Sequence, residues 1–230
     1  MRAVVGDREL HLWRIALSVD DGAYCDMPPI LAQSERERAE RYHFDIDRRR
    51  FVIARASLRQ ILGRYVGVAA GDVALGYGAY GKPLLTNDHG DGGIRFNLSH
   101  SADIALCAIV QRADVGVDVE QVRREMDVQR IAAQFFSPDE QRLLLESSDQ
   151  HETFARIWAR KEAYVKATGD GIGTDLQGFS VSLAASSELR DPSRADLRRW
   201  TVREIAAPSG YAAAVVSSEP LKVTEFRYAP

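Results

Sequence analysis

The chain has 230 residues, of which 45% are hydrophobic and 27% charged, enough apolar material for one large domain or two small ones. Its net charge of −3 excludes a general electrostatic attraction to nucleic acid or to anionic membranes, so we expect neither as a partner. No apolar run reaches the roughly 20 residues that span a bilayer, and the N-terminal residues lack a signal-peptide profile. The two cysteines, Cys25 and Cys107, stand far apart in no metal-ligand spacing, which favours a reducing, cytoplasmic compartment.

In the first half of the chain, predicted strands alternate with predicted helices. Apolar and polar residues alternate over 9–17, which is typical of a strand. Ser34 and Glu37 have the spacing of a capping box, which indicates a helix start. Apolar residues then recur at helical spacing over 47–65, so we expect a long helix with one buried stripe. The glycines and the proline of GYGAYGKP, residues 76–83, indicate a loop with tight turns.

Three strands are predicted next. Residues 94–101 and 104–110 predict consecutive strands, with Ala102 and Asp103 at the turn between them. Residues 113–120, ADVGVDVE, predict a third strand, in which the three valines share one face and the last two acidic residues share the other.

The second half predicts two short helices, one long helix and a strand-rich tail. Residues 126–146 have helical character that breaks at Ser137 and Pro138, and Ser137 can cap the helix that follows. Residues 152–168 predict the long helix. Strand-like stretches then cover 179–185, 197–206, 211–218 and 221–228, interrupted by a polar linker at 186–196.

The two halves therefore share an order of elements: a capped acidic and basic turn, a polar gap, and a helix that opens with an aromatic residue, with strands around it. We interpret this order as an internal duplication, with predicted subdomains at 1–111 and 112–230. The alternative is a coincidental alternation of helices and strands. The fold class that follows from either interpretation is α+β.

Asp118 and Glu120 are two residues apart in a predicted strand, so their carboxylates project from the same face. Two like charges so placed repel each other. A bound Mg²⁺, or alternatively Mn²⁺, would remove that cost, because both ions prefer oxygen ligands. The other interpretation is a solvated face of an antiparallel sheet.

The segment WARKEAYVKATGDG, residues 158–171, places a tryptophan, a glutamate and two lysines on one predicted helix. Glu162 and Lys166 are four residues apart and therefore adjacent on the helix surface, with Lys161 beside them. A third carboxylate here would complete a metal site begun by the strand, and the lysines would lie where phosphate charge collects. The alternative is an exposed Glu–Lys helix pair.

Three other segments contain candidate anion contacts. FNLSHS, residues 96–101, places Ser99 and His100 on opposite faces of a strand end, which excludes pairing as nucleophile and base and favours His100 as an anion contact. The arginine-rich segment 34–50 is either a solvated helix face or a phosphate cradle. GYGAYGKP lacks the Lys-Ser/Thr pair of a Walker loop and is either a plain turn or a phosphate-binding loop.

Taken in order, these segments resemble the 4′-phosphopantetheinyl transferases, and among them the pseudo-dimeric Sfp-type class. The resemblance rests on GKP at 81–83, FNLSHS at 96–101, GVDVE at 116–120 and WARKEAYVKATGDG at 158–171. It covers residues 30–180 well, whereas the tail agrees only in length and strand character and the first 30 residues barely agree.

The resemblance implies two similar α+β subdomains related by pseudo-twofold symmetry, with coenzyme A as co-substrate in a cleft between them. By role, the implied residues are Asp118, Glu120 and Glu162 as magnesium ligands; Lys161 and Lys166 near the pyrophosphate and acceptor; Lys82 and Pro83 beside the adenine; Ser99 and His100 at the coenzyme phosphates; and Arg50 and Arg38 at the 3′-phosphate. The family often has lysines where these two arginines stand.

The implied reaction transfers the phosphopantetheine arm of coenzyme A to a serine of an apo acyl or peptidyl carrier protein, with release of 3′,5′-ADP. Glu162, directly or through a metal-bound water, is the expected base, with Lys166 and Lys161 stabilising charge. We expect a monomer that serves secondary metabolism. Residues 122–136 and the segment around Lys166–Asp170 are the candidate surfaces for an acidic carrier, and the alternative is that they are ordinary core and surface. The alternatives are another Mg²⁺-dependent nucleotide phosphohydrolase and a non-catalytic module that binds coenzyme A or the carrier.

Overall fold

The computed structural model describes residues 2–78, 80–86, 93–184, 189–192 and 200–229. Contacts divide the chain into two compact units, Met1–Arg112 with Lys222–Pro230 and Ala113–Leu221. Each unit combines helices with a sheet, which confirms the predicted α+β class. The last strand belongs with the first unit, whereas the sequence assigned all of 112–230 to the second.

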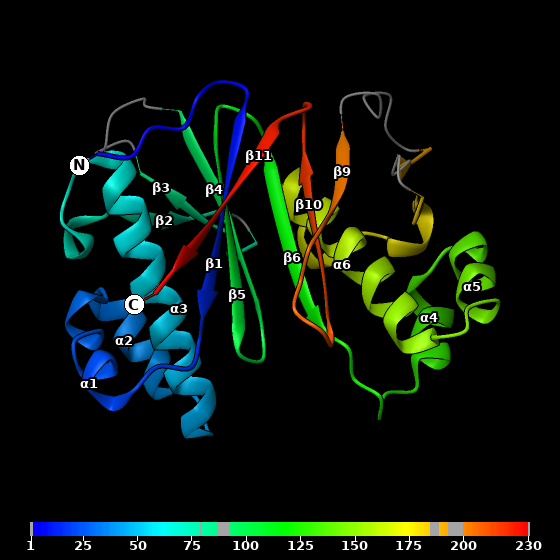
Figure 1. Cartoon of the computed structure of the whole chain (residues 1–230), viewed down its shortest axis with the longest axis horizontal. Helices are drawn as coiled ribbons and strands as arrows, with labels where there is room; N and C mark the ends of the chain where they lie inside the picture. The colour runs from blue at the N-terminus through cyan, green and yellow to red at the C-terminus, as the bar shows by residue number, and fades with distance from the viewer. Residues whose placement is uncertain (1, 79, 87–92, 185–188, 193–199, 230) are drawn as a thin grey trace. The chain divides into compact units, whose positions relative to one another are not determined.

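The first unit is built on a four-stranded sheet, in the order β11-β1-β5-β4, within the residues that the structure describes (Figure 1). These strands are β1 (Glu9–Ala16), β4 (Ile94–Ser101), β5 (Ile104–Gln111) and β11 (Lys222–Tyr228). β1 is antiparallel to β5, and β11 lies parallel to β1 on its other side. The predicted turn at Ala102 and Asp103 joins β4 to β5, and Ala102 adopts a positive φ of 46° there.

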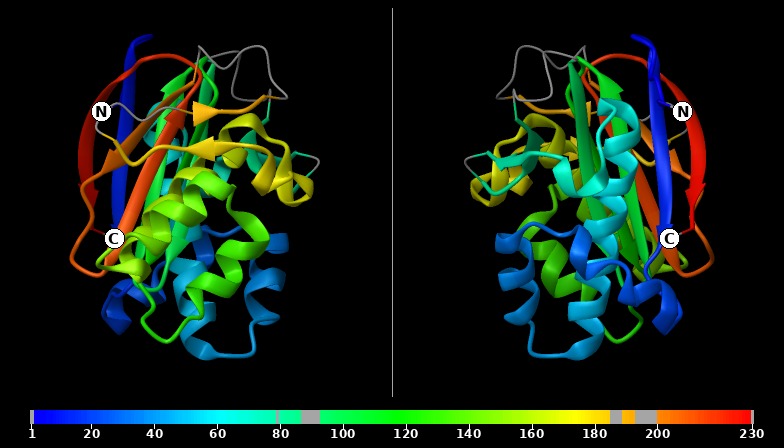
Figure 2. Two further views of the ribbon diagram at one scale, coloured as in Figure 1. Left: turned by 90° about the vertical axis from the view of Figure 1, so that its right-hand side faces the viewer. Right: turned by 90° about the vertical axis from the view of Figure 1, so that its left-hand side faces the viewer.

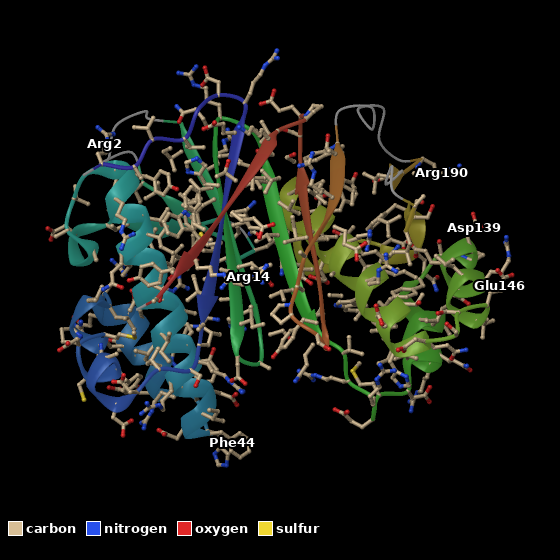
Figure 3. The ribbon with its side chains drawn as sticks, in the orientation of Figure 1. Arg2, Arg14, Phe44, Asp139, Glu146 and Arg190 are labelled. Carbon is tan, nitrogen blue, oxygen red and sulfur yellow. The ribbon has the colours of Figure 1, made fainter. Side chains whose placement is uncertain are left out.

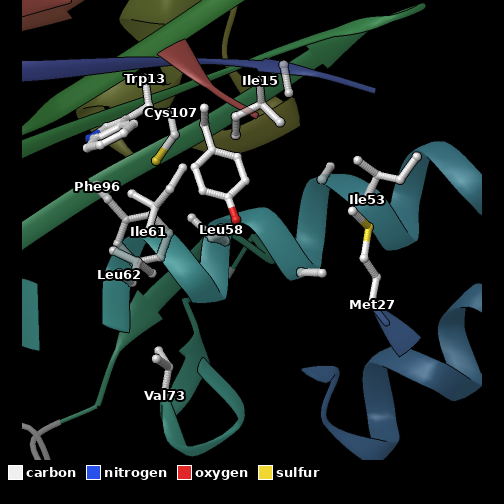
Figure 4. Close-up of a cluster of buried hydrophobic side chains, with 14 of the residues drawn as sticks. Trp13, Ile15, Met27, Ile53, Leu58, Ile61, Leu62, Val73, Phe96 and Cys107 are labelled. Carbon is white, nitrogen blue, oxygen red and sulfur yellow. The ribbon is translucent and has the colours of Figure 1, made fainter. Parts of the chain in front are cut away.

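The helix α3 (Asp45–Val66) packs against this sheet, and its apolar side chains form a large part of the hydrophobic core of the unit. Its apolar stripe, including Leu58 and Ile61, is fully buried, and Figure 4 shows it facing Ile15 of β1 and Cys107 of β5. The helix ends at Gly67, whose φ of 79° is a left-handed conformation that glycine adopts without steric cost. The smaller elements of this unit are α1 (Asp21–Cys25), η1 (Pro28–Ile30), α2 (Gln33–Glu40), η2 (Ala70–Asp72), β2 (Leu75–Tyr77) and β3 (Pro83–Leu85).

The start of α2 differs from the prediction, which placed the cap at Ser34 with Glu37. The N-cap is Ala32, and Glu35 accepts a hydrogen bond of 2.9 Å from the Ala32 backbone N–H. Glu35 is 2% exposed and forms an ion pair of 2.6 Å with Arg59 of α3. The ion pair with the buried Arg59 therefore favours Glu35 over Glu37 as the capping glutamate. Local sequence spacing does not show this long-range contact.

The second unit has a three-stranded sheet, in the order β6-β10-β9, in its described part. Its strands are β6 (Val115–Gln121), β9 (Thr201–Ile205) and β10 (Tyr211–Ser217), and its long helix is α6 (Gln150–Thr168). Figure 2 shows α6 running along one face of this sheet, and α6 contacts both β6 and β10. The remaining elements are α4 (Val128–Phe135), α5 (Pro138–Leu145), η4 (Gly171–Gly173), η5 (Leu176–Gly178), β7 (Ser180–Val181) and β8 (Leu189–Arg190).

The predicted break between α4 and α5 is present. Ser137 caps α5 and accepts from the backbone N–H of Glu140, whose carboxylate accepts in return from the Ser137 N–H. Asp139 and Glu146 lie at the two ends of α5 on the surface (Figure 3). None of the helices in the described part of the chain combines the length and apolarity that crossing a membrane requires.

Candidate active site

Gly116 brings the backbones of β6 and α6 into direct contact. A Cβ at this position would lie 2.0 Å from the Ala163 carbonyl oxygen and 2.4 Å from the Ala167 nitrogen. Real Cβ atoms do not approach backbone atoms so closely, so only glycine fits. The glycine of GVDVE therefore sets the short distance at which the acidic residues of the strand meet the polar residues of the helix.

Asp118 lies two residues beyond Gly116 and faces the same helix, since alternate residues of a strand share a face. Its carboxylate is 2% exposed, and its Oδ1 accepts a hydrogen bond of 2.5 Å from Lys166 Nζ. Burial acts to lower the pKa of Lys166, but the charges of Asp118, Glu162 and Glu120 outweigh it and raise that pKa. The three predicted ligands therefore all act on one ammonium group.

Glu162 is the helix member of this acidic cluster. Its pKa is raised, because burial disfavours the carboxylate and the charge of Asp118 adds to that effect, while Lys166 opposes it. A carboxylate whose proton affinity is raised in this way is a better general base near neutral pH than an exposed glutamate. We call Asp118, Glu120, Glu162 and Lys166 the carboxylate–lysine cluster from here on.

The donor chemistry of this cluster suits a hard divalent cation, because carboxylate oxygens are the ligands that Mg²⁺ and Mn²⁺ prefer. The geometry is not that of an assembled metal site. Among the described residues, no group of three or more histidine, cysteine, aspartate or glutamate side chains is placed to hold a metal ion. The Lys166 ammonium instead lies beside Asp118.

Lys161 does not join the cluster, and the expectation that it contacts phosphate disagrees with its position. Its side chain is fully buried, and Nζ donates to both carboxylate oxygens of Glu140, at 2.9 and 2.7 Å, and to the Phe179 carbonyl at 2.7 Å. Lys161 and Lys166 are five residues apart, which turns them to different sides of α6. We therefore infer that Lys161 stabilises the fold of the second unit.

Glu140 is the residue that sequence reasoning missed. Besides Lys161, it accepts hydrogen bonds from the backbone N–H groups of Ser137 and Val181, both at 2.8 Å. It therefore joins the N-terminus of α5, the middle of α6 and the strand β7. The Ser137–Glu140 capping spacing was the available signal, but it predicts a helix start and not a buried ion pair.

An open cavity of about 540 Å³ lies beside Glu140, lined by residues of α5, of the segment 180–184 and by Arg190. Figure 3 shows Asp139 and Arg190 on this side of the second unit. The cavity lining contains none of the predicted site residues, so this cavity is separate from the carboxylate–lysine cluster.

The predicted arginines of the first unit are both in reach of solvent. Arg50, on α3, donates from Nε and Nη2 to Asp103 Oδ1 at 3.1 and 2.7 Å, which ties the helix to the β4–β5 turn. Arg38, on α2, is exposed, and its guanidinium lies 5.3 Å from the centre of the Phe51 ring. A phosphate at Arg50 would therefore share that guanidinium with Asp103.

The remaining predicted contacts also belong to the first unit. Ser99 is buried and His100 exposed on β4, as expected for neighbours that point to opposite faces. Lys82 and Pro83 are half-buried, and Pro83 begins β3 opposite Tyr77 of β2. The predicted contacts of these four residues with coenzyme A therefore stay predictions.

Comparison with known proteins assigns the family. Residues 114–216 match the model of the 4′-phosphopantetheinyl transferase superfamily, and residues 21–112 match that of the 4′-phosphopantetheinyl transferase N-terminal region. The 4′-phosphopantetheinyl transferase HetI of Nostoc sp. is 38% identical over 210 residues, which cover 90% of this chain and 86% of the relative. This chain therefore belongs to the 4′-phosphopantetheinyl transferases of the Sfp type.

Two further proteins extend the comparison. The 4′-phosphopantetheinyl transferase Sfp of Bacillus subtilis is 26% identical over 211 residues, covering 86% of this chain and 92% of that relative. The crystal structure of holo-[acyl-carrier-protein] synthase from Thermotoga maritima covers 46% of this chain and 62% of its own, with a TM-score of 0.38 and 26% identity.

Proposed function

We propose that this chain transfers the 4′-phosphopantetheine arm of coenzyme A to a serine hydroxyl of an apo acyl or peptidyl carrier protein. Membership of the family supports the reaction class. The observation that carries the proposal is the carboxylate–lysine cluster, in which Asp118, Glu120 and Glu162 all act on the Lys166 ammonium. Such a group of opposite charges suits a pyrophosphate and the cation that accompanies it.

The proposed reaction uses these groups as follows. The serine oxygen attacks the β-phosphorus of coenzyme A, the bond from that phosphorus to the bridging oxygen breaks, and 3′,5′-ADP leaves with the bonding electrons. Glu162, directly or through a metal-bound water, is proposed to accept the serine proton. Lys166, once it leaves Asp118, donates to the pyrophosphate oxygens and stabilises the charge that develops on the leaving group.

The three carboxylates fit this proposal as ligands of a divalent cation. Mg²⁺ held by Asp118, Glu120 and Glu162 would supply charge neutralisation to the pyrophosphate. Asp118 is 2% exposed, and a cation beside it would compensate a buried carboxylate that is otherwise costly.

The coenzyme contacts in the first unit remain part of the proposal. Arg50 and Arg38 are proposed for the 3′-phosphate, and both are positively charged groups that solvent reaches. The exposed ring of His100 is suited to a phosphate contact. Lys82 and Pro83 are proposed beside the adenine.

The carrier protein is proposed to dock on α4, within the predicted segment 122–136. This helix exposes Phe135, at 37%, together with Arg130. An exposed aromatic beside a basic side chain suits an acidic helical partner that offers an apolar contact. Service in secondary metabolism and a cytoplasmic location complete the proposal.

The test is mass spectrometry of an apo carrier protein incubated with coenzyme A, Mg²⁺ and the chain. We expect the carrier to gain the arm with the wild type, and the rate to fall at least about 100-fold for Asp118→Asn and Glu162→Gln. Glu152→Gln, an exposed glutamate in the first turn of the same helix, is the matched control and retains the wild-type rate. Wild-type transfer by the Glu162 variant would refute the assigned site.

The same assay separates the alternative functions. Release of 3′,5′-ADP in the absence of a carrier indicates a nucleotide phosphohydrolase. Binding of coenzyme A without either product indicates a non-catalytic binding module. A panel of apo carriers in this assay identifies the pathway that the chain serves.

A further inference from the structure

The cavity of about 540 Å³ in the second unit lies beside α5 and the segment 180–184. Its described lining contains no member of the carboxylate–lysine cluster, so the proposed reaction makes no use of it. Its volume falls within the range of roughly 300–1,000 Å³ that is typical of small-molecule sites. The chemistry of the lining therefore decides which ligand fits.

Hydrogen bonds hold the walls of this cavity in place. Glu140 of α5 lines the cavity, and its carboxylate accepts from the backbone N–H of Val181, another lining residue, at 2.8 Å. The same carboxylate accepts from Lys161 Nζ at 2.9 and 2.7 Å, which fixes this wall to α6. A site whose walls are already fixed has less to order when a ligand binds, so the cavity is preorganised.

The accessible wall of the cavity is mainly apolar. Its apolar residues are Leu143 of α5 and Val181, Leu183 and Ala184 of the facing segment. Leu143 is 38% exposed, so a ligand in the cavity would remove apolar surface from water. Because such burial is favourable in proportion to the area covered, the lining suits a ligand with an apolar chain.

Arg190 and Ser180 place polar donors together at the wall of the cavity. The two residues are register partners in β7 and β8, so their side chains project from the same face of this two-stranded sheet. Among the described residues of the lining, Arg190 is the one with a basic side chain. A guanidinium beside a hydroxyl matches the two oxygens of a carboxylate.

The two acidic residues of the lining limit the charge of the ligand. Glu140 is paired with Lys161 at 2.7 Å, and Asp139 is paired with Arg142 at 2.8 Å. Both carboxylates would repel a second negative charge on a ligand held by Arg190. A single negative charge therefore suits this site better than two.

We propose that this cavity binds a small monocarboxylic acid with an apolar chain. The chain lies along Leu143 and Leu183, and the carboxylate accepts hydrogen bonds from the Arg190 guanidinium and the Ser180 hydroxyl. The site goes beyond the proposed function, because the transfer of the arm uses none of these four residues. Binding here makes and breaks no covalent bond.

The test follows amide chemical shifts of the isotope-labelled full chain during titration with octanoate, 1-octanol or octyl phosphate, which share one alkyl chain. We expect the Val181 amide to shift with octanoate. Octanoate should bind about 5- to 10-fold more tightly than 1-octanol, because only the acid forms a charge-assisted hydrogen bond with Arg190. Octyl phosphate should bind no more tightly than octanoate, because its second charge meets Asp139 and Glu140.

One pair of variants tests the carboxylate contact. Arg190→Met should weaken octanoate binding about 5- to 10-fold and leave 1-octanol binding within about twofold of the wild type. Arg203→Met changes an exposed arginine of β9 outside the cavity lining and is the matched control. It should bind both probes as the wild type does.

A second pair of variants tests the place of the alkyl chain. Leu143→Trp puts a larger ring into the cavity and should weaken octanoate and 1-octanol each at least about tenfold. Leu145→Trp changes a 61% exposed leucine of the same helix, outside the lining, and should leave both affinities unchanged. Circular dichroism of the two variants checks that each retains the fold.

Four results would overturn the inference. The wild type would show no shift of the Val181 amide with octanoate, or it would bind octanoate and 1-octanol equally. Tighter binding of octyl phosphate than of octanoate would contradict the monocarboxylate. Wild-type affinity of Leu143→Trp for octanoate would place the ligand elsewhere. These titrations contain no coenzyme A or carrier, so a failure of arm transfer would refute the proposed function alone.

Discussion

Each unit buries one glutamate near the start of a short helix and pairs it with a cation of the unit's long helix. In the first unit Glu35 accepts from the Ala32 N–H and from Arg59, and in the second Glu140 accepts from the Ser137 N–H and from Lys161. The two cations each donate a further hydrogen bond to a backbone carbonyl, of Val73 and Phe179 respectively. The long helices α3 and α6 also both end at a glycine with positive φ, Gly67 and Gly169.

The difference between the two units lies in what surrounds the shared ion pair. The second unit balances its glutamate with one lysine, whereas the first adds Arg55 and an excess positive charge. A lysine inside a family motif can therefore stabilise the fold rather than contact a ligand. Of the two motif lysines, Lys161 belongs to the ion pair and Lys166 to the carboxylate–lysine cluster.

The largest effect should come from removing the cation of the second unit. Lys161→Met leaves the fully buried Glu140 without its counter-charge, and we expect a loss of about 3–5 kcal/mol in the free energy of unfolding. Urea denaturation measures it. Glu140→Gln combined with Lys161→Met should recover part of the loss. A Lys161→Met variant of wild-type stability that fails to transfer would contradict the structural assignment.

The corresponding change in the first unit should cost less. Arg59→Met removes the close partner of Glu35, but Arg55 remains 3.5 Å away, so we expect a loss of about 2–3 kcal/mol. The same denaturation experiment compares the two units directly. A loss larger than that for Lys161→Met would show that Arg55 does not compensate Glu35.

A smaller loss should follow a change at the contact between β6 and α6. Gly116→Ala forces the strand away from the Ala163 carbonyl, with an expected cost of about 1–3 kcal/mol and slower arm transfer. Gly173→Ala, where an added Cβ meets no described atom within 4 Å, is the control. Unfolding and transfer measured on both variants should separate them, and equal behaviour would show that the close approach is unnecessary.

The smallest expected effect is a pH dependence of the first unit. His11 Nδ1 lies 2.7 Å from the Tyr65 hydroxyl, which accepts from Trp13 Nε1, and burial lowers the pKa of His11 below 6.5, although Glu9 opposes this. The unfolded chain then binds a proton more readily, so stability should fall as the pH drops below 6.5. Thermal unfolding between pH 5 and 8 should show a shallower dependence for His11→Asn, and an identical dependence would exclude His11 as the cause.

Local patterns in the sequence predict most of the elements on which the site depends. Alternation over 113–120 predicts β6, helical spacing predicts α6, and the Ser137 cap predicts the division between α4 and α5. These features are local because each depends on residues within one or two turns or pleats. The meeting of residues 116–120 with residues 158–171 in the carboxylate–lysine cluster is predicted by the family resemblance and not by local spacing alone.

Long-range contacts account for what the sequence analysis missed. The pairing of β11 with β1 joins residues more than 200 positions apart, and nothing in the tail marks its partner. Capping by Glu35 rather than Glu37 and the burial of Lys161 both depend on a partner in another element. Charge alone predicts that such residues are exposed, and tertiary pairing reverses that expectation.

The most direct test of the account is calorimetric titration of Mg²⁺ in the presence of coenzyme A. The proposal under test is that Asp118, Glu120 and Glu162 would hold a divalent cation when coenzyme A is bound. We expect coenzyme-dependent Mg²⁺ binding by the wild type and at least about tenfold weaker binding by Asp118→Asn. Binding of Mg²⁺ by Asp118→Asn with wild-type affinity would contradict the claim.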